Sequence, residues 1–173
     1  PRIPVLYASF LGSLKTGAIA CLLFSAFQEQ ALFDRLENSG ASVLFTTQEL
    51  SKRVEGIKSK LPNLKHIVIV DSPEFIGGIS KQKDSFSCVH TKPEDYAFML
   101  YTSGTTGKPK GVVHTHNGIL HAYVTASWVL DLKKDDIYWC TADPGWVTGI
   151  VYGILAPLMH GITMVVHAGR FDV

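Results

Sequence analysis

The strongest constraint on the fold is a strand, a helix and a second strand with little chain between them. Ser42–Thr46 (SVLFT) is predicted to be a short buried strand, and His66–Val70 (HIVIV) is a second, β-branched strand. Between them Gln48–Lys60 is predicted to be a helix that Thr47 could cap. At this spacing the three segments form a βαβ unit, which implies parallel strand pairing and helices on the sheet faces.

The same alternation runs through the rest of the chain. The predicted helices are Val5–Thr16 with Gly17 as C-cap, Gln28–Ser39 closed by Gly40, Asn117–Leu130 with Asn117 as N-cap, and Trp146–Met159, broken by Gly149, Gly153 and Pro157. The predicted strands are Tyr96–Tyr101, Gly111–Thr115, Ile137–Thr141 and Ile162–His167, and Ser72–Lys92 is expected to be a surface loop or small excursion. The sequence therefore predicts an α/β fold of βαβ units over a mostly parallel sheet.

Length and hydropathy leave two interpretations open. A chain of 173 residues can form one domain with its own core, but 46% hydrophobic residues and a mean hydropathy of +0.17 are high for that size. Either the chain is part of a larger protein, with apolar surfaces that meet missing neighbours, or it is a well-packed α/β domain with buried parallel strands.

Charge and the length of the apolar stretches exclude two classes of partner, nucleic acid and membrane. The 16 basic and 15 acidic side chains form no basic stripe, so no nucleic-acid partner is expected. The longest apolar stretches, Val5–Leu14 and Ile19–Phe24, are too short or too interrupted to span a bilayer, so no membrane partner is expected either. Three widely spaced cysteines are typical of reduced thiols in a cytoplasmic protein.

The segment with the clearest chemistry is Thr102–Gly111, TSGTTGKPKG, directly after a predicted strand. Its ten residues include four hydroxyl side chains, three glycines and two lysines. Glycines let backbone amides approach phosphate oxygens, hydroxyls donate hydrogen bonds to them, and lysines supply positive charge. The alternative without a binding function is a hydroxyl-rich surface turn, but the concentration of these groups after a buried strand favours a phosphate-binding loop.

Two other phosphate-binding motifs do not match this loop. The Walker A motif requires a hydroxyl residue after Gly-Lys, whereas Pro109 follows Lys108, and the position five before Gly107 is Thr102 instead of glycine. The dinucleotide pattern GxGxxG is absent. An unrelated P-loop kinase or ATPase is therefore disfavoured.

The longer segment YTSGTTGKPKGVVHTH resembles the signature of the adenylate-forming superfamily, which includes acyl-CoA synthetases, luciferases and the adenylation domains of peptide synthetases. CTADPGWVTG, at residues 140–149, is similar to the segment that follows in acetyl-CoA synthetases. FLGSLKTGAIACLLFSAF, DRLENSGASVLFTT and PNLKHIVIVD match the same family in order. The resemblance covers essentially residues 1–173, which it identifies as part of the adenylate-forming N-terminal domain, closest to the acetyl-CoA synthetase branch.

The resemblance implies an ATP-dependent acid–thiol ligase. Such enzymes use ATP and Mg²⁺ to convert acetate or a related carboxylate to an acyl-adenylate and pyrophosphate, and coenzyme A then takes the acyl group. It further implies that the loop lines the ATP β- and γ-phosphates and that a second segment approaches the acyl and coenzyme A pocket. The phosphate residues are Thr102, Ser103, Gly104, Thr105, Thr106, Gly107 and Lys110, and the pocket residues are Trp146, Val147 and Thr148.

Two points qualify this assignment. Trp146 could equally be a core residue, because a tryptophan in an apolar helix usually is. Relatives often continue Trp-Val-Thr-Gly with His and then Ser or Thr, whereas this chain has Ile150 and Val151. An apolar wall there would tolerate an acyl chain longer than acetate.

Several of the family's motifs do not occur in the chain. There is no Tyr-Gly-x-Thr-Glu segment, no later aspartate for the ribose hydroxyls and no C-terminal lysine for adenylation. We therefore expect an internal fragment that has the phosphate loop, carries no catalytic residue and is inactive without the remainder of its parent chain. The alternative is a truncated, non-catalytic nucleotide-phosphate-binding or interaction module.

Histidines near the loop could suggest a metal site. His114 and His116 would share one face of a strand, but His121 falls on the following helix, and no cysteine or carboxylate is suitably near in sequence. No bound structural metal is expected. Asp143, before Pro144-Gly145, is expected to form a turn and not to act as a base.

Overall fold

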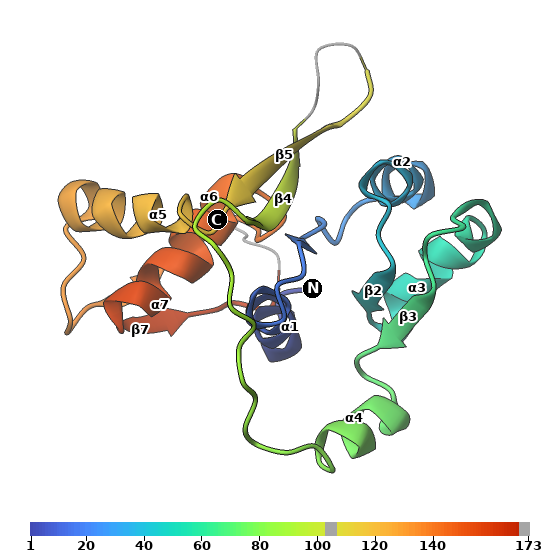
Figure 1. The fold of residues 1–173 in the computed structure, drawn as a ribbon, viewed down its shortest axis with the longest axis horizontal. Helices are drawn as coiled ribbons and strands as arrows, with labels where there is room; N and C mark the ends of the chain where they lie inside the picture. Colours follow the sequence, from blue (N-terminus) through green and yellow to red (C-terminus); the bar gives the residue numbers. More distant parts are fainter. Residues whose placement is uncertain (103–106, 170–173) are drawn as a thin grey trace. The chain divides into compact units, whose positions relative to one another are not determined.

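The computed structural model describes residues 1–102 and 107–169 (Figure 1). The chain divides into two compact units. The first comprises Pro1–Phe24, Cys88–Leu100 and Val112–Val173, and the second comprises Ser25–Ser87 and Tyr101–Gly111.

The first unit contains a three-stranded sheet, a separate pair of strands and several helices. Its sheet has the order β1-β4-β5, with β1 pairing parallel to β4, and a separate parallel pair joins β6 to β7. Its strands are β1 (Ala20–Cys21), β4 (Tyr96–Thr102), β5 (Lys110–Thr115), β6 (Ile137–Trp139) and β7 (Thr163–Val165), β4 and β5 each extending into the second unit. Its helices are α1 (Pro4–Lys15), α5 (Ile119–Thr125), α6 (Val147–Ile150) and α7 (Ala156–His160), with π-helical turns at Ala126–Leu130 and Val151–Leu155.

The second unit contains the predicted βαβ unit. Its elements are α2 (Glu29–Ser39), β2 (Val43–Thr46), α3 (Gln48–Glu55), a 3₁₀ turn (Lys58–Lys60), β3 (His66–Ile69) and α4 (Pro73–Ile79). Strands β2 and β3 pair in parallel from Val43 opposite His66 to Thr46 opposite Ile69. The Thr47 hydroxyl accepts a hydrogen bond from the Leu50 amide at 3.4 Å, which confirms the predicted cap.

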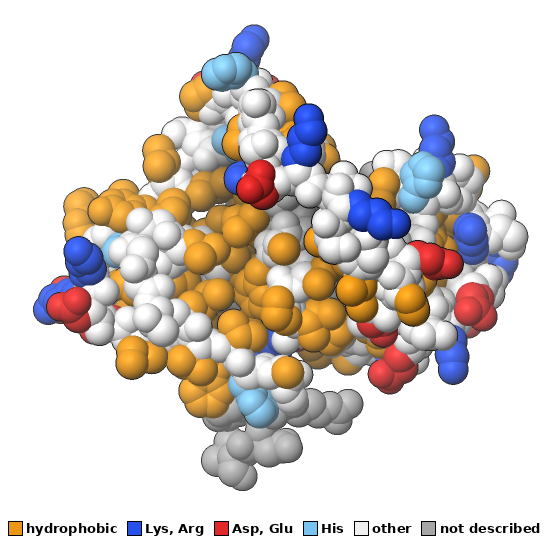
Figure 2. All heavy atoms as spheres, turned by 90° about the horizontal axis from the view of Figure 1, so that it is seen from below, with side chains coloured by type: hydrophobic (Ala, Val, Ile, Leu, Met, Phe, Trp, Pro, Cys, Tyr) orange, Lys and Arg blue, Asp and Glu red, His pale blue; other side chains and the backbone are white. Residues whose placement is uncertain are grey.

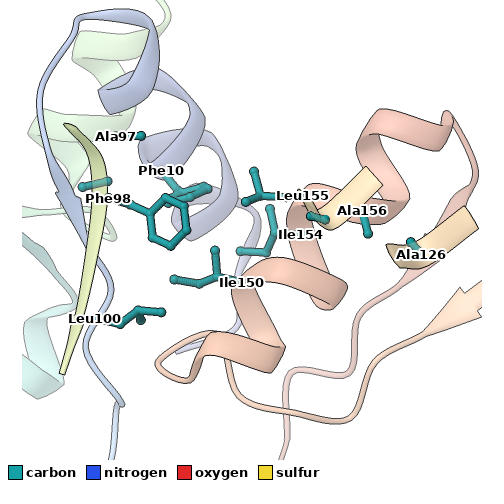
Figure 3. Close-up of a cluster of buried hydrophobic side chains, with 11 residues drawn as sticks. Phe10, Ala97, Phe98, Leu100, Ala126, Ile150, Ile154, Leu155 and Ala156 are labelled. Carbon is teal, nitrogen blue, oxygen red and sulfur yellow. The ribbon is translucent and has the colours of Figure 1, made fainter. Parts of the chain in front are cut away.

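The main core lies in the first unit (Figure 3). Phe10 of α1 packs edge-on against Phe98 of β4, with ring centroids 6.0 Å apart, and Ile150 and Ile154 are fully buried beside them. These side chains come from a helix, a strand and the segment before α7, so the core joins parts of the chain that are distant in sequence. It supports the strand β4 from which the candidate phosphate loop departs.

Three local predictions were wrong. The strand β2 is not buried, because Val43 and Phe45 remain 43% and 45% exposed. The segment 72–92, expected to be a surface loop or a small excursion, contains only the short helix α4, which the Ser72 hydroxyl caps by accepting from the Phe75 amide at 3.1 Å. The N-cap of α5 is Gly118 and not Asn117, while the Thr115 hydroxyl accepts a hydrogen bond from the Gly118 amide at 3.3 Å.

The third error concerns the predicted helix Trp146–Met159: the chain is helical from Val147 to His160, as expected, but neither the two glycines nor the proline breaks it. It changes from α to π geometry and back to α. Pro157 has no amide hydrogen, and its ring would clash with the carbonyl four residues earlier in a regular α-helix. The wider π-helical turn before it accommodates the proline without ending the helix.

Large hydrophobic side chains are widely exposed, as the orange surface in Figure 2 shows. The clearest group follows α5, where Trp128 and Val129 are 83% and 77% exposed, and Ile137 at the start of β6 is 75% exposed. Apolar surface of this extent usually contacts another protein surface. No helix within the described residues is long and apolar enough to cross a membrane.

We therefore expect the 173-residue chain to self-associate in solution. Replacing both Trp128 and Val129 with lysine should reduce the association measurably, because it removes the two most exposed apolar side chains of this group. Light scattering across a concentration series measures the effect, with the exposed Lys134→Glu variant as a control. A monodisperse monomer from the unmodified chain would contradict the prediction.

Candidate active-site segments

The candidate phosphate loop connects β4 to β5 (Figure 1), and its two ends belong to the second unit. Thr102 ends β4, and its Oγ1 donates to the carbonyl oxygen of Lys110, the first residue of β5, at 3.5 Å. Ser103, Gly104, Thr105 and Thr106 lie outside the described residues, so their predicted contacts with phosphate stay predictions. The hydrogen bond closes the loop at its base.

The described part of the loop fits an anionic ligand. Gly107 has φ +91°, a conformation that side-chain-bearing residues rarely adopt, and nothing lies within 4 Å of the position where a Cβ would stand. Lys108 and Lys110 are both exposed, so their ammonium groups can reach a ligand in solvent. An open glycine backbone with two mobile cations suits a polyphosphate.

Tyr101, which precedes the loop in sequence, is 6% exposed and fixes the end of β4 to helix α2. Its hydroxyl lies 2.8 Å from Asn38 Oδ1 and 3.1 Å from the carbonyl oxygen of Arg35. The Arg35 guanidinium lies 4.0 Å from the ring centroid of Phe27 and 5.6 Å from that of Tyr101. The sequence pattern gave no signal for this cluster.

The candidate acyl and coenzyme A segment lies in the first unit. Trp146 has extended backbone and precedes α6, and its ring centroid is 6.1 Å from that of Phe24. Trp146 and Val147 are 46% and 50% exposed, so Trp146 is not a core residue. Thr148 is also exposed, while its carbonyl oxygen lies 3.9 Å from Cys140 Sγ. Their predicted role in lining a pocket stays a prediction.

Two glycines and one carboxylate shape this segment. As expected, Asp143 forms a turn, accepting from the Gly145 amide at 2.8 Å, and it also lies 3.7 Å from Arg2. A Cβ at Gly145 would lie 2.7 Å from the Phe24 amide nitrogen, and one at Gly149 would overlap the Asp143 carbonyl. Gly149 therefore permits close packing of α6 on the Asp143 turn, a role that the sequence interpretation as a helix breaker missed.

We expect Gly149→Ala to destabilise the chain by about 1–3 kcal/mol or more, because the added methyl group would overlap backbone. Gly12→Ala is the matched control, since α1 leaves open space around Gly12 and alanine favours a helix by about 1 kcal/mol. Thermal unfolding should show a midpoint several degrees lower for Gly149→Ala only. Equal midpoints for the two variants would show that α6 can move away from the turn.

A cavity of about 10 Å³ lies beside α6 and has room for about one water molecule. It is too small to be an acyl pocket. Its lining includes Arg2, Tyr7, Cys140, Gly149 and His167, but neither Trp146 nor Thr148.

The histidines near the loop have local contacts of other kinds. His114 stacks on Phe98 with ring centroids 4.5 Å apart, and burial lowers the pKa of its imidazole. No group of three or more His, Cys, Asp or Glu side chains suited to a metal occurs in residues 1–102 and 107–169.

Comparison with known proteins gives a consistent result. The model of the AMP-binding enzyme family matches residues 1–172. The chain is 49% identical over 180 residues to an acetyl-coenzyme A synthetase of Bacillus subtilis, covering 99% of this chain and 31% of that protein. It is 34% identical over 197 residues to an acetyl-coenzyme A synthetase of Pyrobaculum arsenaticum, covering 99% of this chain and 29% of that protein.

Two solved structures of acyl-CoA and anthranilate CoA ligases have a fold similar to that of this chain. A Brucella canis acyl-CoA synthetase superposes with a TM-score of 0.87 and 29% identity, covering 99% of this chain and 32% of that one. An anthranilate CoA ligase in complex with anthranoyl-AMP gives a TM-score of 0.87 and 31% identity, covering 94% and 33%. The chain thus spans about a third of the length of the relatives it matches.

Proposed function

Because the chain belongs to the family of AMP-binding enzymes, we propose that it is the phosphate-binding part of an acyl-CoA ligase. The proposed reaction joins acetate or a related short carboxylate to coenzyme A through an acyl-adenylate. The observation that carries the proposal is the 49% identity to an acetyl-coenzyme A synthetase across 99% of the chain. The proposed domain is residues 1–173 as part of the adenylate-forming N-terminal domain, and the cytoplasm is its proposed location.

The proposed role of the loop follows from its chemistry. In adenylation the carboxylate oxygen attacks the α-phosphorus, and the bond to the bridging oxygen of pyrophosphate breaks. Negative charge accumulates on the leaving group, where hydroxyl donors from Thr102, Ser103, Thr105 and Thr106 and the Lys110 ammonium would stabilise it. The amides of Gly104 and Gly107 would let the loop approach closely.

The proposed role of the other segment concerns the acyl group. Trp146 and Val147 present half-exposed apolar surface suited to a short acyl chain, and Thr148 adds an exposed hydroxyl that we assign to the coenzyme A side. Ile150 is fully buried in the core and Val151 is partly buried, so their departure from the usual motif alters packing behind the segment. Acyl specificity would then depend on Trp146 and Val147 directly.

The test is carboxylate-dependent ATP–pyrophosphate exchange by the complete enzyme that carries this sequence. Acetate, propionate and butyrate are compared, followed by acyl transfer to coenzyme A. Exchange with at least one of them, and thioester formation after coenzyme A is added, would support the proposal. Nucleotide binding without exchange for any acid would instead support a non-catalytic module.

The 173-residue chain alone is expected to show no exchange. It lacks the family's Tyr-Gly-x-Thr-Glu, ribose-binding and catalytic-lysine segments. The same assay on the isolated chain decides this, with the complete enzyme as the positive control.

A further inference from the structure

We propose that Tyr101, Arg35 and Asn38 form an anchor that positions the phosphate loop for adenylation, with Arg35 as the central positioning residue. This inference rests on the proposed function. Thr102 directly follows Tyr101, so whatever fixes the Tyr101 side chain fixes the point at which the loop leaves β4. All the residues involved belong to the second unit.

The first part of the anchor is the Tyr101 hydroxyl. It lies within hydrogen-bonding distance of two oxygens of α2, the Asn38 amide oxygen at 2.8 Å and the Arg35 carbonyl at 3.1 Å. One hydroxyl proton can be donated to only one of them at a time, and the shorter distance favours Asn38. Both oxygens lie on α2, more than sixty residues earlier in the sequence, so the bond is a tertiary link from a helix to the base of the loop.

The second part is the Arg35 side chain. Its Nη1 donates to the Ala31 carbonyl at 2.8 Å, which holds the planar group against its own helix. The guanidinium carbon then lies 4.0 Å from the Phe27 ring centroid and 5.6 Å from that of Tyr101, both within the range of cation–π attraction. Arg35 thereby helps to hold the Tyr101 ring, which directly precedes the loop, in place.

The third observation is that this cation has no carboxylate partner within the described residues. Its Nε is buried and makes no hydrogen bond. A purely structural arginine is usually paired when its polar atoms are buried. An unneutralised guanidinium at the base of an anion-binding loop is instead suited to a site that will receive negative charge.

The alternative is that the cluster only packs α2 onto the end of β4. The two roles differ in what they affect. A packing role lowers thermal stability and leaves the rates of both half-reactions intact in the folded enzyme. A positioning role slows adenylation, where pyrophosphate leaves, and spares thiol attack on preformed acyl-adenylate, where no pyrophosphate is present.

Tyr101→Phe in the complete enzyme is the sharpest test, because it removes one oxygen atom and keeps the ring. We expect kcat for ATP–pyrophosphate exchange to fall about 3- to 10-fold, the effect of one neutral hydrogen bond, with the thiol half-reaction changed less than about twofold. Tyr152→Phe is the matched control, because its hydroxyl donates to Thr125 Oγ1 at 3.0 Å within the first unit.

Arg35→Lys and Arg35→Met then separate planar stacking from charge. Lysine keeps the charge but cannot reproduce the flat stack with its fixed hydrogen bond to Ala31. We expect both variants to lose about 10-fold or more in exchange, with lysine restoring little. Thermal unfolding of each variant is measured in parallel.

Each outcome has a defined meaning. Exchange by the wild type with Tyr101→Phe as active as Tyr152→Phe would overturn the anchor and leave the proposed function standing. Equal slowing of both half-reactions by Arg35→Met would also overturn it, since an anchor of the phosphate loop should slow only the step in which pyrophosphate leaves. No exchange by the wild-type enzyme with any carboxylate would overturn the proposed function and the anchor together.

Discussion

Replacing Thr105 or Thr106 with alanine in the complete enzyme is expected to slow acyl-adenylate formation by about one to three orders of magnitude. Each hydroxyl is proposed to donate to the pyrophosphate leaving group, and this is the range for losing one preorganised donor to a developing anion. The contact strengthens as charge accumulates, so kcat and kcat/KM should fall together. Single-turnover formation of acyl-adenylate, followed by rapid quench, measures the step directly.

The second half-reaction supplies the control within the same protein. Thiol attack on preformed acyl-adenylate involves no pyrophosphate, so the same variants should retain nearly the full rate of that step. Thr16→Ala is the matched substitution, because Thr16 is exposed and its hydroxyl bonds only locally, to the Ser13 carbonyl at 2.8 Å. Equal loss in both half-reactions would mean that the two threonines support the fold and do not bind pyrophosphate.

The elements that the sequence predicts well are those determined by neighbouring residues. Gly40 closes α2 with φ +61°, and Thr47 caps α3 through its hydroxyl, both as expected from local chemistry. The parallel pairing of β2 and β3 also follows, because a short connection with a helix leaves few other topologies.

The wrong predictions are those in which burial or a competing side chain determines the local structure. The apolar run SVLFT predicts a buried strand, but β2 has only one pairing partner in the described structure and leaves Val43 and Phe45 about half exposed. Asn117 has high cap propensity, yet the helix starts later and the Thr115 hydroxyl meets the Gly118 amide instead. The burial of β2 depends on residues that fold against the strand, whereas the start of α5 depends on competition between neighbouring polar side chains, and cap propensity alone does not resolve that competition.

In the candidate site, too, features set by consecutive residues could be predicted and contacts between distant residues could not. The composition of Thr102–Gly111 is enough to suggest phosphate, because the relevant groups are consecutive in the chain. The contacts between Tyr101 and α2 could not be predicted, since Arg35 lies 66 residues away in sequence and arginine on an amphipathic helix usually faces solvent. Gly149 was misjudged for a similar reason, because its close neighbour is the backbone of a turn.

The two lysines of the loop should differ strongly. Lys110 begins β5, and its carbonyl oxygen accepts from Thr102 Oγ1 at 3.5 Å, so its backbone is held at the base of the loop. Lys108 lies outside both strands, between Gly107 and Pro109. A charge on a fixed backbone loses less conformational freedom when it meets a phosphate. We therefore expect Lys110→Met to lower kcat/KM for adenylation about 10- to 1,000-fold and Lys108→Met to lower it less than about fivefold.

The comparison is well controlled, because both substitutions remove one charge from an exposed lysine within the same loop. The net charge therefore changes equally, and any general electrostatic attraction for ATP falls by the same amount in both variants. Lys110→Arg should recover part of the rate, since arginine also donates to phosphate, though with a different geometry. Steady-state exchange with varied ATP gives kcat and KM for each variant. Similar losses for Lys108→Met and Lys110→Met would show that the loop acts through its total charge, and that anchoring Lys110 to Thr102 has no part in catalysis.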